Sequence, residues 1–358
     1  MAELTESEFE DRLAGVLLGT ALGDALGLIC EGLNKEQIKR RFGKIGDFHL
    51  LPGHGYFSDD TEQSALLAQA LAKHPDDVRA CCRDFQRALF AWLLRMPYGV
   101  GLATISSCFR IALFMERSGV KSAGNGSAMR AAIIGVYFHE LPEKRKLFSI
   151  KIAETTHTDP RAVAASLFVA DLAAASMNKK NDRIMDCFLD SIDSVEENTL
   201  KARLLKAAEL AEARADTATA LLELKCSGFV LHSVPLAVFC FLRFGDGDIS
   251  DALGEIISAG GDTDSNAAIL GAWLGARHGA AALPGSLINR LDDGPFGPTH
   301  LRKLAHCLSQ IRKGEKPLLP TYNFLSAFLR NLWVLCIILI QIVIRILCRI
   351  YELLTGVR

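Results

Sequence analysis

The sequence predicts an all-α protein, and three observations support this fold class. Apolar residues recur at three- and four-residue steps over many long segments, which is the period of a helix. These segments are rich in Ala and Leu and lack the β-branched alternation of strands. Short stretches rich in Gly, Pro and Asp, such as 52–60 and 291–298, separate them.

The expected helices follow one another along the chain with these loops between them. The glycine-containing segment 17–33 comes first, and the mostly apolar helix that follows Phe229 is expected in the interior. The other segments with clear helical periodicity are 61–73, 128–138, 162–177, 202–215 and 267–279. No repeat of fixed period and no low-complexity linker interrupts the chain before about residue 314. We therefore expect one compact domain over residues 1–316 and a separate tail over 317–358.

The tail differs from the rest of the chain in composition. Residues 331–344 carry no charge, but such a run is shorter than the roughly 20 residues that a membrane span needs. Counting 100° per residue, Gln341, Arg345, Arg349 and Glu352 share one narrow face of a helix, which leaves a wide apolar face. The pattern is typical of a basic amphipathic helix.

Two interpretations of this tail stay open. A terminal helix can dock on the core of its own chain or on another subunit. Alternatively, residues 324–352 bind a membrane surface or form a short tail anchor, with the arginines extending towards the lipid headgroups. Both interpretations leave the oligomeric state undetermined.

Overall composition excludes some function classes. Half of the 358 residues are hydrophobic and the net charge is −1, so no nucleic-acid partner is indicated. The ten cysteines include no Cys-x-x-Cys pair, and the acidic N-terminus lacks the basic and apolar regions of a signal peptide. We expect reduced thiols and a cytoplasmic protein, membrane-associated if the terminal helix binds lipid.

The segment 260–266, Gly-Gly-Asp-Thr-Asp-Ser-Asn, starts a helix with more acids than one cap requires. Asp262 and Asp264 would repel each other unless a cation or a shared proton compensates. Oxygen ligands without His or Cys indicate magnesium, manganese or calcium. The segment is not an EF-hand loop, since Ala267 and Trp273 stand where that loop requires Gly and Glu.

A second acidic helix start lies about two hundred residues earlier. Ser58 is a suitable N-cap, and Asp59, Asp60 and Glu62 occupy the first turn. Acidic helix starts are common, so either segment alone is weak support for a site. Together they predict two helix N-termini that meet and hold a pair of divalent ions.

Glycine-rich segments suggest what this centre binds. Residues 124–130, Gly-Asn-Gly-Ser-Ala-Met-Arg, lead into a helical segment, and exposed backbone N–H groups there would suit a phosphate. The segment lacks the Gly-Lys of a P-loop. Gly19, Gly23 and Gly27 lie on one face of a helix and indicate tight helix packing. The acids Asp24 and Glu31 in this apolar region require partners.

Two further residues have both a structural and a functional interpretation. His157 lies in a loop before Pro160, where it either supports the fold or donates a hydrogen bond to phosphate or sugar oxygens. Phe229 opens a mostly apolar helix, where it either packs in the core or presents an aromatic face to a ligand.

Five motifs, taken in order, resemble the ADP-ribosylglycohydrolase family, which includes the dinitrogenase reductase-activating glycohydrolases and the ADP-ribosyl-acceptor hydrolases. The resemblance extends from about residue 12 to 280, so the tail lies outside it. The motifs are Gly23-Asp24-Ala25-Leu26-Gly27 with Glu31, Ser58-Asp59-Asp60-Thr61, Gly124 to Arg130, His157-x-Asp159-Pro160, and Gly260 to Ala267.

The resemblance implies a compact multi-helix bundle with two Mg²⁺ ions, or Mn²⁺, in a central cleft. It implies catalytic roles for Glu31, Asp60 and Asp262, with Glu31 near the metals or the scissile bond. Gly124, Asn125, Gly126 and Ser127 would surround ribose and diphosphate with His157 nearby, and Phe229 would lie near the adenine. The implied metal ligands are Ser58, Asp59, Asp60, Asp262, Asp264 and Ser265; no expected acid is replaced.

The implied reaction is hydrolysis of the bond between ADP-ribose and an acceptor side chain on a protein or a small conjugate. The alternative is an ADP-ribose-binding or immunity-type module that counters ADP-ribosylation by binding or blocking. A nucleotide-sugar transferase using Asp-x-Asp shares the metal chemistry, but those enzymes are mostly α/β. No motif selects among arginine, serine and other acceptors.

Overall fold

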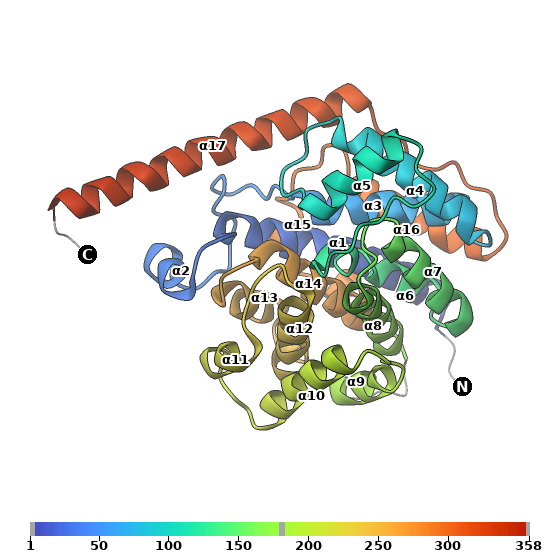
Figure 1. Cartoon of the computed structure of the whole chain (residues 1–358), viewed down its shortest axis with the longest axis horizontal. Helices are drawn as coiled ribbons and strands as arrows, with labels where there is room; N and C mark the ends of the chain where they lie inside the picture. Colours follow the sequence, from blue (N-terminus) through green and yellow to red (C-terminus); the bar gives the residue numbers. More distant parts are fainter. Residues whose placement is uncertain (1–3, 179–182, 356–358) are drawn as a thin grey trace.

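A computed structural model describes residues 4–178 and 183–355. Within this part of the chain there are seventeen α-helices, three short 3₁₀ turns and no strand, so the all-α prediction is confirmed (Figure 1). The 3₁₀ turns are η1 (Leu28–Cys30), η2 (Asn125–Ser127) and η3 (Ala280–Ala282). The helices are α1 (Glu6–Gly27), α2 (Lys35–Phe42), α3 (Asp59–Lys73), α4 (Val78–Leu93), α5 (Leu102–Ala112), α6 (Ala132–Tyr137), α7 (Pro142–Glu154), α8 (Pro160–Ser176), α9 (Ile184–Ile192), α10 (Asn198–Glu212), α11 (Thr217–Leu224), α12 (Val230–Phe244), α13 (Ile249–Ser258), α14 (Thr263–His278), α15 (Gly285–Ile288), α16 (Pro298–Arg312) and α17 (Phe324–Thr355).

Most predicted helices form where their periodicity indicated. The segments 61–73, 162–177, 202–215 and 267–279 lie within or almost within α3, α8, α10 and α14. The glycine-rich segment differs, because it forms the turn η2 and α6 begins only at Ala132. The backbone of this segment therefore approaches the site as a turn and not as the first turn of a long helix.

Helices α1 and α14 pack together at the centre of the molecule through facing glycines. A Cβ atom on Gly19 or Gly23 would lie closer than 3.0 Å to the backbone carbonyl of Gly271 or Ala267. Only residues without a side chain permit this approach, so the predicted tight packing is confirmed. The contact brings Asp24, near the end of α1, level with the first turn of α14.

Helix α17 lies along one edge of the domain and extends beyond it (Figure 1). The side chains that it buries recur at helical spacing: Ala327, Asn331, Val334, Ile337 and Ile338. Its polar residues bond to the domain, including Gln341, which donates to the carbonyl of Leu50 at 3.2 Å. The described part of α17 is therefore docked on its own chain through one side.

Candidate metal centre

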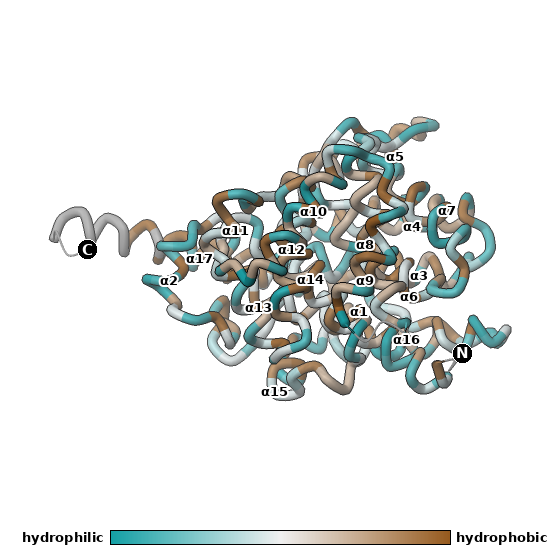
Figure 2. Tube along the Cα trace, turned by 90° about the horizontal axis from the view of Figure 1, so that it is seen from below, coloured by the Kyte–Doolittle hydropathy of each residue, from teal (hydrophilic) through white to brown (hydrophobic). Residues whose placement is uncertain are grey.

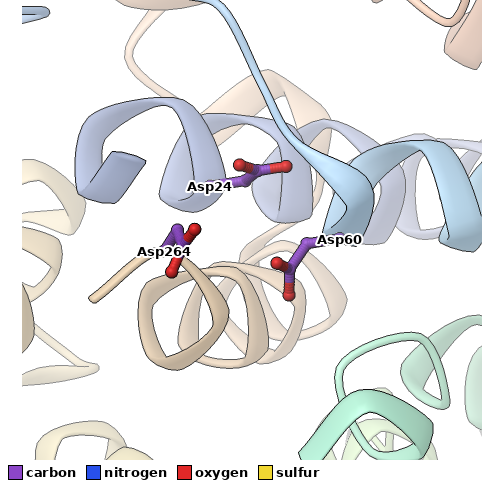
Figure 3. Close-up of side chains that lie close together, drawn as sticks. All are labelled: Asp24, Asp60 and Asp264. Atoms are coloured by element: carbon purple, nitrogen blue, oxygen red, sulfur yellow. The ribbon is translucent and has the colours of Figure 1, made fainter. Parts of the chain in front are cut away.

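Three buried carboxylates meet where α1, α3 and α14 converge. Asp24, Asp60 and Asp264 each offer an oxygen atom, and these oxygens all lie within 4.8 Å of one another. Figure 3 shows the three side chains facing a common space from three different helices. Such a set of oxygen donors is compatible with one divalent cation.

Asp24 also fixes the start of α3. Its carboxylate accepts hydrogen bonds from the main-chain N–H of Ser58 at 2.9 Å and of Thr61 at 3.0 Å, and from the Thr61 hydroxyl at 2.6 Å. The sequence predicts that Asp24 needs partners, but the predicted metal ligands do not include it. The signal that could have identified Asp24 as a ligand is the presence of an acid next to the glycines of an otherwise apolar helix.

The two N-cap residues at this site leave their side chains available for other contacts. Ser58 caps α3 and Asp262 caps α14, yet in the described structure neither side chain accepts the usual bond from the helix N-terminus. By contrast, Asp77 and Asp248 cap α4 and α13 in the ordinary way. The acids in the segment 260–266 are therefore not explained by capping.

Asp60 joins the two acidic segments. Its Oδ2 atom accepts a hydrogen bond from Ser265 at 3.2 Å and lies 3.5 Å from the Ser58 hydroxyl. The structure thus brings together the two helix starts that the sequence predicted would meet. Asp60 Oδ1 is buried and has no hydrogen-bond partner in the described part of the chain. A buried carboxylate oxygen without a partner fits a metal ligand.

Burial and mutual repulsion dominate the electrostatics of this cluster. Burial raises the pKa of Asp59, Asp60 and Asp264 well above the usual carboxyl range, and neighbouring acids raise these pKa values further. The neighbours include Asp24, whose own pKa is raised by burial, and Glu31. A divalent ion would offset this repulsion and allow the acids to ionise together.

The donors fit a hard divalent cation such as magnesium or manganese. Asp24, Asp60 and Asp264 could hold it directly, with the Ser58 and Ser265 hydroxyls beside Asp60. Asp59 occupies a different place, since its Oδ2 atom accepts a bond from Gln63 at 2.8 Å. The number of ions and the part played by each predicted ligand remain predictions.

Glu31 lies at the edge of the cluster, at the end of η1. Its negative charge contributes to the raised pKa values of Asp59 and Asp264, which places it within electrostatic reach of both. The Tyr98 hydroxyl donates to Glu31 Oε2 at 3.0 Å. Glu31 is half-buried, so a carboxylate at this position can exchange protons with solvent.

The glycine-rich segment is attached to the cluster by Asn125. The Asn125 side-chain amide donates to Asp262 at 2.9 Å and to Ser233 at 3.1 Å, and its main-chain N–H donates to Gly228. Gly124 pairs with Phe229 in an isolated bridge. The segment therefore lies between the start of α14 and the start of α12, while Ser127 is buried beneath it against Ser166.

His157 lies directly below this turn. A Cβ atom added to Gly124 or Gly126 would lie 3.4 or 3.1 Å from its ring, and its Nδ1 atom is 2.8 Å from the Thr156 hydroxyl. Burial, and to a smaller extent the nearby charge of Arg130, lowers the pKa of His157 to about 3. The imidazole is therefore neutral at physiological pH, and it supports the glycine turn as well as being placed near any ligand there.

Arg130 connects three parts of the site and was not among the predicted site residues. Its guanidinium donates to Gln63 of α3 at 2.6 Å, to the carbonyl of Gly126 at 2.7 Å and to the Thr156 hydroxyl at 2.5 Å. Burial lowers its pKa to about 10, so it stays charged at neutral pH. Through Gln63 this cation is coupled to Asp59.

Phe229 is half-buried at the N-cap of α12. The Arg161 guanidinium lies 5.4 Å from the centre of its ring, and His232 packs against it edge to face at 5.0 Å. Arg161 is itself held by Asp159, with its Nη2 atom 2.8 Å from the carboxylate. A role for Phe229 beside an adenine remains a prediction.

Comparison with known proteins identifies the family to which this chain belongs. The family model described as ADP-ribosylglycohydrolase matches residues 5–317. The chain is 25% identical over 301 residues to the ADP-ribosyl-[dinitrogen reductase] glycohydrolase of Rhodospirillum rubrum, covering 81% of this chain and 93% of that protein. It is 27% identical over 322 residues to human ADP-ribosylhydrolase ARH3, covering 77% and 87%.

A solved structure shares the fold. An ADP-ribosylglycohydrolase-related protein complex matches with a TM-score of 0.66 and 23% identity, covering 85% of this chain and 99% of that one. The match of the family model to nearly the whole domain, together with the hydrolases among the relatives, gives both family and enzyme class. The chain belongs to the ADP-ribosylglycohydrolase family and is a hydrolase.

Proposed function

We propose that this hydrolase cleaves the glycosidic bond between ADP-ribose and an acceptor side chain, and that it requires Mg²⁺ or Mn²⁺. The observation that carries the metal dependence is the buried group formed by Asp24, Asp60 and Asp264, in which one Asp60 oxygen lacks a partner among the described residues. Similarity to hydrolases that are named for ADP-ribose supports the choice of bond.

Different residues of this chain would bind the metal, transfer the proton and bind the substrate. A divalent ion held by the acids would supply charge stabilisation and lower the pKa of a bound water. Glu31 is placed to accept or return a proton at the edge of the cluster, and Tyr98 orients its carboxylate. Asn125 orients Asp262, and the turn from Gly124 to Ser127 would face the ribose and diphosphate. Breaking the bond develops oxocarbenium character at the ribose carbon, as in other glycoside hydrolyses.

A panel of defined substrates tests this function. The full chain is incubated with peptides that carry ADP-ribose on arginine or on serine, in magnesium or in chelator, and released ADP-ribose is quantified. We expect release from at least one substrate in magnesium only, and the panel identifies the acceptor. Binding of these peptides without release in magnesium or manganese would support the alternative of a blocking module and overturn hydrolysis.

Two variants with matched controls connect this activity to the site. Glu31→Gln should reduce release by about 10²–10⁴-fold, the range of a lost general acid or base, and Asp60→Asn should abolish metal-dependent release. The controls Glu196→Gln and Asp76→Asn change carboxylates whose side chains are 88% and 78% exposed. They should keep wild-type activity. Full activity in both site variants would overturn the assignment.

A further inference from the structure

We propose that the outward side of α17 binds the surface of an anionic lipid bilayer, with the helix lying in the plane of the membrane. The polar residues of the described helix are on the opposite side. Three of them donate hydrogen bonds to the domain. Arg330 donates to Glu62, Asn331 to the carbonyl of Arg95, and Gln341 to the carbonyl of Leu50. Docking therefore uses the side of α17 that carries these polar residues, together with the buried Ala327, Val334, Ile337 and Ile338, and leaves an apolar side outward.

The outward side is apolar from Phe324 to Leu347, the part of the helix whose side chains the structure describes apart from residue 345. At 100° per residue its exposed side chains span an arc of about 200°. Figure 2 shows in brown the last coloured turns of α17, where the helix extends past the rest of the chain. The large apolar side chains that are exposed on α17 are Phe324, Leu325, Leu329, Leu332, Trp333, Leu339, Ile340, Ile342, Val343, Ile344, Ile346 and Leu347.

The width of this arc favours a bilayer over a second protein helix. A single packed helix contacts an apolar stripe of roughly 100°, so half of the arc would stay in water. A lipid surface covers the whole arc at once, because acyl chains adapt to any shape. Burying such a continuous face of leucine, isoleucine and valine side chains stabilises the bound state in proportion to the apolar area covered.

The contacts of α17 exclude a membrane-crossing arrangement for the docked protein. Residues 324–344 include Arg330 but are long and apolar enough overall to cross a bilayer, with a mean hydropathy of 2.3 in their 18-residue window. However, hydrogen bonds from Trp333 to Tyr56 and from Gln341 to Leu50 hold this same stretch lengthwise against the domain. A span would require about 20 residues to leave the domain, so a docked α17 can meet a bilayer only along its outward side.

The charge of the helix indicates anionic lipid. Between Gln341 and Thr355 the sequence carries two arginines, Arg345 and Arg349, and one acid, Glu352. Basic residues of an interfacial helix pair with the phosphates of anionic headgroups. The segment also lies beyond residue 317, where the family match ends.

Vesicle flotation of the full chain tests the proposal. Deleting α17 would remove Arg330 from Glu62 and disturb the domain, so the outward side is changed instead. The variant is Leu339→Gln/Ile340→Gln/Val343→Gln, at side chains that are 52%, 59% and 54% exposed. The control is Leu113→Gln/Phe114→Gln/Leu222→Gln, at side chains that are 73%, 95% and 82% exposed on other helices and turns.

We expect the wild type and the control to float with vesicles of phosphatidylcholine and phosphatidylserine. The α17 variant should bind at least about tenfold more weakly, while keeping its helical circular dichroism and its unfolding temperature. Equal binding of the α17 variant, or no binding of the wild type, would overturn the proposal. A stable wild-type dimer that the α17 variant converts to a monomer would assign the surface to a second copy of the chain. Equal binding to phosphatidylcholine alone would overturn the requirement for anionic lipid.

Discussion

Arg330 of the terminal helix α17 forms an ion pair with Glu62 of the metal-site helix α3, with 2.9 Å between Nη1 and Oε1. The two side chains are only 8% and 1% exposed. Trp92 donates to the other oxygen of Glu62 at 2.6 Å, and Arg330 also donates to the carbonyl of Phe57 at 2.9 Å. Phe57 immediately precedes Ser58, so a residue of the tail stabilises the segment that starts the metal-site helix.

Replacing Arg330 should destabilise the domain. In Arg330→Ala the Glu62 carboxylate stays buried, without its charged partner and with Asp59 one turn away in α3. Breaking a buried ion pair by removing one partner costs about 3–5 kcal/mol. We expect a loss of that size in the free energy of unfolding, measured by urea denaturation in the presence of a chelator.

An exposed ion pair provides the control for this change. Lys206 and Glu209 are 37% and 67% exposed, so Lys206→Ala should cost no more than about 0.5 kcal/mol. Adding Glu62→Gln to the Arg330 variant should recover part of its loss, because the unpaired charge is gone. If Arg330→Ala cost no more than Lys206→Ala, the ion pair would have no structural importance.

Asp60→Asn should separate metal binding from folding. In the metal-free protein the neutral amide relieves repulsion from Asp59 and Asp24, so the variant should unfold in chelator at a temperature equal to or above that of the wild type. Magnesium at about 100 times its dissociation constant should stabilise the wild type by about 2.7 kcal/mol and should not stabilise the variant. Thermal unfolding over a magnesium titration measures both effects. A magnesium response in Asp60→Asn as large as that of Asp76→Asn would show that Asp60 does not hold the ion.

The pH dependence of stability should reverse its usual direction in chelator. The pKa values of Asp59, Asp60 and Asp264 are raised in the folded state, chiefly by burial, so the folded protein binds protons more tightly than the unfolded chain. Between the usual carboxyl pKa of about 4 and these raised values, the free energy of unfolding must fall as pH rises.

Calorimetry from about pH 5 to about pH 8 measures this slope. Saturating magnesium should remove it, because a bound cation keeps the acids ionised across the range. At lower pH the opposite contribution appears from acids such as Asp159, whose pKa is lowered by its hydrogen bond to Arg161; the stability from such acids is lost as they become protonated. A slope in chelator that is unchanged in an Asp60→Asn/Asp264→Asn variant would contradict the assignment.

The sequence permitted prediction of the elements and of the meeting of two acidic helix starts. Periodicity identified the helices around the site, and the excess acids at two helix N-termini indicated a shared role. In the structure the hydrogen bond from Ser265 to Asp60 connects these two N-termini. Local pattern suffices for such features because helix period and capping chemistry depend on nearby residues.

Other parts of the site depend on tertiary contacts that no local pattern encodes. Asp24 enters the cluster because α1 and α14 approach through glycines, and Arg130 matters because three separate segments supply its acceptors. In α17 the periodicity identified a polar side and an apolar side. It could not show that the polar side faces the domain, since a hydrophobic pattern does not specify its partner.

The glycine contact between α1 and α14 connects packing to the metal centre, and Gly23→Ala tests that connection. The new methyl group would lie closer than 3.0 Å to the carbonyl of Ala267, so the helices must separate. Overpacking of this kind costs about 1–3 kcal/mol of unfolding free energy. It should also weaken magnesium binding, because Asp24 follows Gly23 directly while Asp264 moves with α14.

Urea denaturation in chelator measures the loss of stability, and a magnesium titration of thermal stability measures the weaker binding. Gly46→Ala is the control, since a Cβ atom there would have no neighbour within 4 Å among the residues that the structure describes. Equal behaviour of the two variants would mean that the helices accommodate the methyl group without moving the acids.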